Sequence, residues 1–191
     1  QVKMLVEKFE RKKIAYLLVR EPGSTSISEK IRKILLDKEL GEMNSRTEAL
    51  LMMASRAQLT KEIIVPKLKN GFVIIADRFI DSTIAYQGAG RGLSIDILDK
   101  INNFATHELK PDITFLIDVS SKLASKRRKK SELDRIEKVG NKFQEQVRDQ
   151  YLKLASENKN RFVTLDGKPT PENIHKIIWN KFNIAIKKRK I

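Results

Sequence analysis

The sequence predicts an α/β protein in which a parallel sheet lies between two layers of helices. Short apolar runs alternate along the chain with longer amphipathic segments, and each run is continuous instead of alternating with polar residues. A continuous apolar run indicates a strand that is covered on both faces, which is typical of parallel sheets with helical crossover connections. The 191 residues contain no repeat and no linker-like segment, so we expect one domain.

The helices follow from periodicity and from end signals. Residues 1–13 repeat apolar side chains at helical spacing, and Ser26 with Glu29 fits a capping box at the start of a second helix. A long helix from Ser45 to Lys69 is expected to break near Pro66, because proline lacks the backbone donor that a helix interior requires. The expected helices span residues 1–13, 26–36, 45–69, 96–109, 122–130, 138–158 and 171–187.

The expected strands are apolar runs at residues 14–19, 72–76, 113–119 and 162–165. Polar, charged and glycine residues follow them, namely REPGST at 20–25, DR at 77–78, Asp118, and DGK at 166–168. In a parallel α/β sheet a ligand binds outside the carboxyl ends of the strands. The sequence therefore predicts the functional site at this edge.

Composition narrows the classes of partner. The 39 basic and 24 acidic residues give a net charge of +15, which suits a polyanion such as nucleic acid. Aromatic stacking residues are not interleaved with the basic clusters, so we favour a solvated basic surface with a basic tail at 186–191. Without cysteine, disulfides and cysteine zinc sites are excluded, and we expect a reducing, cytoplasmic location. No signal peptide and no membrane-spanning run are expected.

Two arginines are candidates for phosphate binding, because a guanidinium presents several donors in a planar fork. Arg78 follows a buried strand and should be held rigidly. Arg56 lies among small and apolar residues of the long helix, so it should either reach a cleft or pair with an acid. His107 and His175 are far apart in sequence and form no recognisable metal motif, so the sequence leaves the identity of any metal ligand open.

A turn of helix after Arg78 brings hydroxyl, amide and phenol groups together. Ser82, Thr83, Tyr86 and Gln87 are three or four residues apart, so they can share a face, bind the edge of a base and pack on a sugar. The alternative is that Ser82 caps the helix and Tyr86 belongs to the core. The basic stretch KRRKKSELDR at 126–135 is interpreted as either a mobile lid over a phosphoryl group or a solvated helix end.

These residues resemble those of the thymidylate kinases, in their bacterial form. The matching strings follow the family's order and spacing over nearly the whole chain, and their specificity comes from the combination. They are REPGST at 20–25, RTEALL at 46–51, ASR at 54–56, DR at 77–78, AYQG at 85–88, GRG at 90–92, PD at 111–112 and LDRIE at 133–137.

The resemblance implies a P-loop NTPase-type three-layer α/β/α fold with a parallel five-stranded sheet. It implies one nucleoside monophosphate kinase domain over residues 1–191, with a lid segment at about 124–138. The implied reaction transfers the γ-phosphate of ATP, with Mg²⁺, to thymidine monophosphate (dTMP) for dTTP synthesis. The implied partners are dTMP, ATP and a second copy of the chain, with the helix from Ser45 as a candidate interface. No membrane partner is implied, and nucleic acid is not expected.

Site residues are also carried over from the resemblance. Arg56 and Arg78 would hold the acceptor phosphate, with Arg32 as a neighbour and Glu21 shaping the site. The remaining substrate-binding residues would contact the nucleoside: Thr83 and Gln87 would read the thymine edge beside Ser82, Tyr86 would pack on the deoxyribose and Met52 would contact the base.

Catalysis is expected to involve positive charge over the ATP phosphates. The resemblance implies that Arg128, Lys130 and Arg135 belong to the lid and act with Arg78 on the transferring phosphoryl group. Arg128, Arg135 and Lys168 would contact ATP. The family's usual lid arginine aligns best with Lys130, so Arg128 or Arg135 is expected to supply the charge-stabilising guanidinium.

Two departures from the family pattern bear on function. Met52 stands where the family usually has a phenylalanine that stacks on thymine. The Walker A pattern G-x-x-x-x-G-K-[ST] does not occur in these residues, and the resemblance would place it immediately before Gln1. We therefore expect that the first strand and the phosphate loop are missing from the printed residues. Either they belong to the complete protein, which we favour, or the molecule is truncated and inactive.

Two other functions remain open at this point. The first is another nucleoside monophosphate or deoxynucleoside kinase, which Met52 allows. The second is a catalytically dead, basic nucleic-acid-binding module, which the net charge of +15 and the Walker A departure allow.

Overall fold

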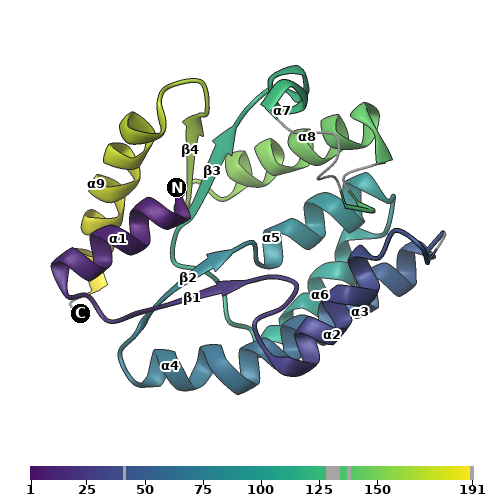
Figure 1. Ribbon diagram of the computed structural model, residues 1–191, viewed down its shortest axis with the longest axis horizontal. Helices are drawn as coiled ribbons and strands as arrows, with labels where there is room; N and C mark the ends of the chain where they lie inside the picture. The colour runs from purple at the N-terminus through teal and green to yellow at the C-terminus, as the bar shows by residue number, and fades with distance from the viewer. Residues whose placement is uncertain (41, 128–133, 137–138, 190–191) are drawn as a thin grey trace.

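The computed structural model describes residues 1–40, 42–127, 134–136 and 139–189, and in these ranges four parallel strands form two pairs at the centre of the molecule (Figure 1). Strand β1 (Tyr16–Arg20) pairs with β2 (Val73–Asp77), and β3 (Thr114–Asp118) pairs with β4 (Phe162–Asp166). All four expected strands are therefore present, displaced by two residues or fewer at their ends. The structure confirms a mixed α/β fold with parallel strands.

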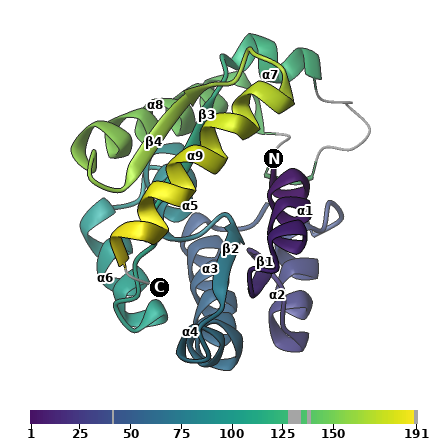
Figure 2. The same ribbon diagram turned by 90° about the vertical axis from the view of Figure 1, so that its left-hand side faces the viewer.

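Helices cover both faces of the strands. Helices α1 (Val2–Lys12) and α9 (Pro171–Arg189) lie on one face, and Figure 2 views the molecule from that side. The other face carries α3 (Ser45–Leu59), η1 (Thr60–Ile64), α4 (Val65–Lys69), α5 (Ile80–Thr83), η2 (Ile84–Gly90) and α8 (Asn141–Glu157). Helices α2 (Ser26–Leu36) and α6 (Ile95–Thr106) pack against α3, and α7 (Ser121–Arg127) follows β3.

An aromatic cluster around Phe9 joins α1 and α9 to the strands. The Phe9 side chain is fully buried, and its ring centroid lies 5.6 Å from that of Tyr16 in β1 and 4.7 Å from that of Phe182 in α9. Ile75 of β2 belongs to the same cluster, and Phe115 of β3 packs against it. This cluster therefore contacts both strand pairs and holds them in one layer.

The helical path from Ser45 to Lys69 does not break at Pro66, so that expectation was wrong. A π-helical segment, η1, precedes the proline, and the backbone N–H of Val65 reaches back five residues to the Thr60 carbonyl. This change of hydrogen-bond register lets the helix continue past a residue that has no N–H to donate.

The start of α2 also differs from the expected capping box. Thr25 is the N-cap, and its hydroxyl accepts a hydrogen bond from the Ser28 N–H at 3.0 Å. The Glu29 carboxylate accepts from the N–H of Ser24 at 2.7 Å, one residue before the cap. The cap lies at Thr25 instead of Ser26 because Thr25 has the extended backbone that an N-cap needs.

The two strand pairs are not joined by a backbone ladder within the described ranges. A five-stranded sheet is therefore not seen in this part of the chain. No helix in the described part is both long enough and apolar enough to span a membrane.

Replacing Phe9 tests whether its cluster holds the layers together. We expect Phe9→Ala to lower the free energy of unfolding by about 3–5 kcal/mol, because the large buried ring leaves a cavity. Ile184→Ala is the control, since Ile184 lies in the same cluster's helix, α9, but is 52% exposed. The free energy of unfolding of this control variant should change by about 0.5 kcal/mol or less. Urea unfolding followed by circular dichroism measures both variants, and equal losses would contradict the assignment.

Candidate functional site

A cavity opens at the carboxyl ends of β1 and β2, where the loop after β1 meets α2, α3 and η2. This is the edge of the sheet at which the sequence predicts a site. The structure brings all nine predicted substrate-binding residues to the lining of this one cavity: Glu21, Arg32, Met52, Arg56, Arg78, Ser82, Thr83, Tyr86 and Gln87.

The loop after β1 is held by contacts to two helices and to β2. The backbone N–H of Glu21 donates to the Asp77 carbonyl at 3.1 Å, which continues the β1–β2 pairing into the loop. The N–H of Gly23 donates to Ser55 of α3 at 3.2 Å, and Arg32 of α2 donates to the Pro22 carbonyl at 2.9 Å. These bonds fix the position of Glu21 at the cavity wall.

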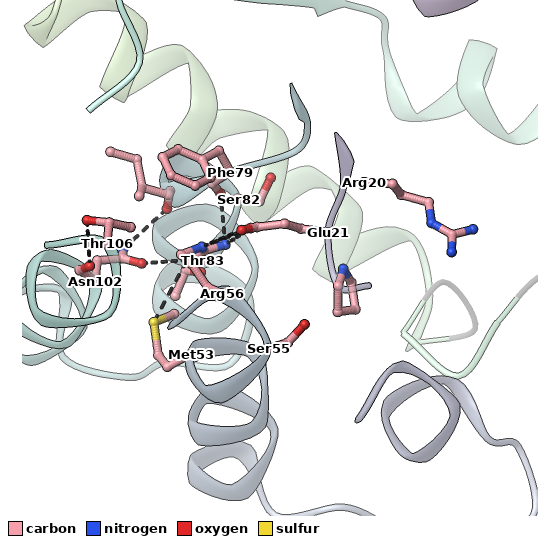
Figure 3. Close-up of polar contacts among 12 residues, drawn as sticks. Arg20, Glu21, Met53, Ser55, Arg56, Phe79, Ser82, Thr83, Asn102 and Thr106 are labelled. Carbon is pink, nitrogen blue, oxygen red and sulfur yellow. Dashed lines mark hydrogen bonds and ion pairs between the residues drawn. The ribbon is translucent and has the colours of Figure 1, made fainter. Parts of the chain in front are cut away.

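Arg56 lies beneath the cavity with its guanidinium almost completely buried (Figure 3). Its Nε and Nη2 bind the Glu21 carboxylate, and Nη2 also donates to the Phe79 carbonyl at 3.1 Å. Its Nη1 donates to Thr83 Oγ1 at 2.8 Å and to the Asn102 side-chain oxygen. The guanidinium thereby joins the loop after β1 to α3, α5 and α6.

The position of Arg56 resolves the choice that the sequence left open between a cleft and an acid. Arg56 does both: it pairs with Glu21 and it lines the cavity. Each guanidinium nitrogen already has a protein partner. The expected contact of Arg56 with an acceptor phosphate stays a prediction, and it would require exchange of one of these bonds.

Arg78 differs from Arg56, because it forms no salt bridge with the described residues. It follows β2 with a positive φ of 71°, a conformation that non-glycine residues seldom adopt. Its guanidinium carbon lies 4.9 Å from the centre of the Tyr86 ring. In the described part of the chain no carboxylate forms a salt bridge with it, so no ion pair competes with a ligand for its charge.

Two further arginines line the cavity near Arg78. Partial burial lowers the pKa of Arg32, and the like charge of Arg20 lowers it further. Arg20 binds Glu29 at 2.9 Å, but both of these side chains are largely exposed, which makes the pair weak. Arg20, Arg32 and Arg78 therefore place three positive charges on the cavity lining, beside the carboxylates of Asp77 and Asp134.

The adjoining part of the cavity lining is built from the segment that follows Arg78. Residues 84–90 form a π-helix, η2, which extends α5 and points the Gln87 side chain inward. The ring of Tyr86 meets those of Phe143 and Tyr151 of α8 edge to face, with centroids 6.0 and 6.4 Å apart. The Tyr151 and Ser82 hydroxyl oxygens are 2.7 Å apart, and burial raises the pKa of Tyr151 to about 12. Tyr86 is therefore both a packed residue and a wall of the cavity.

A second buried carboxylate, Glu48 of α3, lies behind Gln87. It accepts a hydrogen bond from Gln87 Nε2 at 3.0 Å, from Arg91 at 2.9 Å and from Arg135 at 2.7 Å. Burial would raise the pKa of Glu48, but the hydrogen bonds from Arg91, Gln87 and Arg135 outweigh it, so that the net effect is a lowered pKa. The carboxylate is therefore ionised in the folded protein.

Of the expected catalytic and ATP-binding residues, some lie at or behind the cavity and others lie away from it or outside the described residues. Arg78 lines the cavity, and Arg135 binds Glu48 and the Leu35 carbonyl behind it. Arg128 and Lys130, like most of the expected lid at about 124–138, lie outside the described residues. Lys168 is exposed in the turn after β4 and does not line this cavity.

Sequence reasoning assigned no role to Glu48, Arg91, Arg20 or Asn102, although the structure places all four in or behind the cavity wall. A signal for Glu48 was present in the sequence. It lies four residues before Met52 and seven before Ser55, so it shares the inward face of α3. An acid on the apolar face of a helix indicates buried basic partners.

No cluster of three or more histidine, aspartate or glutamate side chains suited to a metal ion occurs among the residues that the structure describes. The described side chains thus offer no protein cage for the Mg²⁺ that the sequence resemblance implies.

Comparison with known proteins gives a consistent match. A family model described as thymidylate kinase matches residues 1–178. A thymidylate kinase of Fervidobacterium nodosum is 50% identical over 183 residues, which cover 96% of this chain and 91% of the relative. Those of Thermosipho africanus and Kosmotoga olearia are 47% and 42% identical, covering 91% and 98% of this chain and 86% and 90% of the relatives.

Breaking the buried ion pair should cost far more than breaking an exposed one. Glu21→Gln leaves the Arg56 guanidinium buried without a negative partner, and we expect the free energy of unfolding to fall by about 3–5 kcal/mol. Glu157→Gln is the matched control, because its side chain is 53% exposed beside Lys153 at 4.0 Å. It should change stability by about 0.5 kcal/mol or less. Urea denaturation measures both, and a small effect of Glu21→Gln would argue against a structural ion pair.

Proposed function

Because the chain belongs to the thymidylate kinase family, we propose that it transfers the γ-phosphate of ATP to dTMP and releases thymidine diphosphate and ADP. The single observation that carries the residue assignments is the cavity at the ends of β1 and β2, which is lined by Arg20, Arg32 and Arg78 in one part and by amide and hydroxyl groups in another. An acceptor nucleotide needs both kinds of lining, one for its phosphate and one for its base.

The phosphate of dTMP lies against Arg78 and Arg32 in this proposal. Arg78 has no carboxylate partner in the described ranges, and the pKa of Arg32 is lowered by its surroundings, which a phosphate would reverse. Arg20 adds charge at the same part of the lining. Arg56 contributes mainly by holding Glu21 and Thr83, since its guanidinium nitrogens are already engaged.

The thymine base lies against Gln87 and Thr83 in this proposal, and Met52 lines the same cavity. Both polar side chains are buried and line the cavity, so each can make a bond that water cannot replace. Met52 offers a polarisable thioether to the base, and such sulfur–aromatic contacts are favourable. Tyr86 is held by Arg78 and α8, so its ring is a rigid support for the deoxyribose.

For the phosphate donor, we propose that Arg128, Lys130 and Lys168 supply charge around ATP, with the segment at about 124–138 as a lid. Arg135 binds Glu48 and the Leu35 carbonyl in this structure, so it would join them only by exchanging these bonds. Mg²⁺ commonly binds through substrate phosphates and few protein carboxylates, so it would enter with ATP. We also propose that a fifth parallel strand, ending in a phosphate loop, lies between β2 and β3. The facing edges of these strands are unpaired in the described part of the chain, which supports a strand there. A nucleotide-bound structure of the complete protein would test this arrangement.

We further propose that two copies associate through α3 and α6. Leu50 of α3 is 57% exposed, and Ile97 and Phe104 of α6 lie seven residues apart and are 57% and 84% exposed. Clustered exposed apolar side chains are typical of protein interfaces. Light scattering would show a dimer for the natural chain and a monomer for Phe104→Asp, whereas a monomeric natural chain would refute the proposal.

Removal of the Arg78 side chain should impair catalysis without unfolding the protein. We expect Arg78→Ala to lower kcat/KM for dTMP by about 10- to 100-fold, because a charge-assisted hydrogen bond to phosphate is lost. Arg11→Ala removes an exposed arginine of α1 and should leave kcat/KM unchanged. A coupled assay of ADP release measures both, and normal kinetics for Arg78→Ala would refute its assigned role.

Removal of the Gln87 amide should relax the choice of base. We expect Gln87→Leu to reduce the preference for thymidine monophosphate over cytidine monophosphate by about tenfold or more, because a buried amide rejects a base that leaves it unpaired. Steady-state assays with thymidine, uridine and cytidine monophosphates provide the measurement. An unchanged order of substrates would mean that the base is read by other residues.

A further inference from the structure

We propose that Glu48 is a positioning residue that sets base selectivity by holding the Gln87 amide in one orientation. Glu48 lies behind Gln87 and is fully buried, so it cannot contact the substrate directly. The inference rests on the proposed function, because it assigns a second residue to the recognition of the same base.

The orientation of the Gln87 amide follows from the chemistry of its partner. An ionised carboxylate only accepts hydrogen bonds, whereas a glutamine side chain presents a donor at one end and an acceptor at the other. Gln87 Nε2 lies 3.0 Å from Glu48 Oε1, so the amide nitrogen is turned toward α3. No hydrogen bond to Gln87 Oε1 occurs within the described ranges, and Gln87 lines the cavity. The amide oxygen is therefore left to accept a hydrogen bond from a ligand.

Two arginines keep the Glu48 carboxylate ionised, so that it can only accept hydrogen bonds. Arg91 binds Glu48 through both Nε and Nη2, at 3.1 and 2.9 Å, and Arg135 binds it at 2.7 Å. These contacts keep Glu48 charged although its side chain is fully buried. A flipped Gln87 would place its carbonyl oxygen against this negative charge, and repulsion would exclude that orientation.

The fixed acceptor discriminates between pyrimidines. Thymine and uracil carry an N–H at ring position 3, which can donate to Gln87 Oε1. Cytosine carries a lone pair at the same position, so two acceptors would face each other and the buried amide would be left without a donor. Glu48 thus determines that the cavity selects a base with an N3–H, although it lies outside the cavity lining.

The Glu48→Gln variant tests this role. The new amide can accept from Gln87 or donate to it, so Gln87 is free to present either end. We expect the ratio of kcat/KM for dTMP to that for dCMP to fall by about tenfold or more, with the dTMP value falling and the dCMP value rising. Isothermal titration calorimetry with dTMP should show the weakened binding independently of turnover.

Arg91→Gln is the matched control. It removes one charged partner of Glu48 and should destabilise the protein, but it leaves the Glu48–Gln87 bond and the Arg135 contact in place. We expect its selectivity ratio to match that of the natural chain. If Glu48 were merely structural, both variants would lose thermal stability and neither would change the ratio.

A double-mutant cycle with Gln87→Leu shows whether Glu48 affects base selectivity through Gln87 or through a general disturbance of the cavity. In the Gln87→Leu background, Glu48→Gln should not change the ratio further, because the amide that Glu48 orients is gone.

If Glu48→Gln does not fold, Glu48→Asp replaces it, since the shorter side chain keeps the charge but withdraws from Gln87. An unchanged ratio in the folded variant overturns the inference. Failure of the natural full chain to phosphorylate dTMP would overturn the proposed function instead.

Discussion

The buried ion pair between Arg56 and Glu21 is the constraint on which the rest of the site depends. Two charges removed from water are unfavourable unless their hydrogen-bonding groups are satisfied, and here the guanidinium has four partner residues on three segments. Because those partners come from the loop after β1, from α5 and from α6, satisfying one guanidinium also fixes three segments around α3. The cavity is therefore preorganised before any ligand enters.

Glu48 is a second buried charge, in this case negative, and it is also satisfied by hydrogen bonds. Three residues that are distant from it in the sequence donate to its carboxylate. Gln87 lies in the π-helical segment η2, Arg91 directly follows it, and Arg135 comes from the carboxyl-terminal part of the expected lid. π-helical turns are rare and concentrate at functional sites, where they displace side chains from ordinary α-helical positions. Here the turn lets Gln87 face both Glu48 and the cavity.

The sequence predicted the elements and the edge of the site well, because both depend on local patterns. Continuous apolar runs identify the strands, and charged residues after β1 and β2 mark their carboxyl ends. The π-helical path around Pro66 and the cap at Thr25 depend on backbone conformation, which residue types alone do not determine. Glu48 was missed because its partners lie 39, 43 and 87 residues away.

The sequence alone does not show which arginines have a structural role and which can bind a ligand. Arg56, Arg91 and Arg161 bind carboxylates and hold elements together, whereas Arg78 has no such partner in the described part of the chain. The net charge of +15 does not distinguish these roles, because a paired arginine contributes little field at a distance. What concentrates positive potential at the cavity is the placement of the acids. Glu21 and Glu48 pair with Arg56, Arg91 and Arg135, whereas Arg78 forms no salt bridge in the described part of the chain and lines the cavity with Arg20 and Arg32, which suits an anionic acceptor.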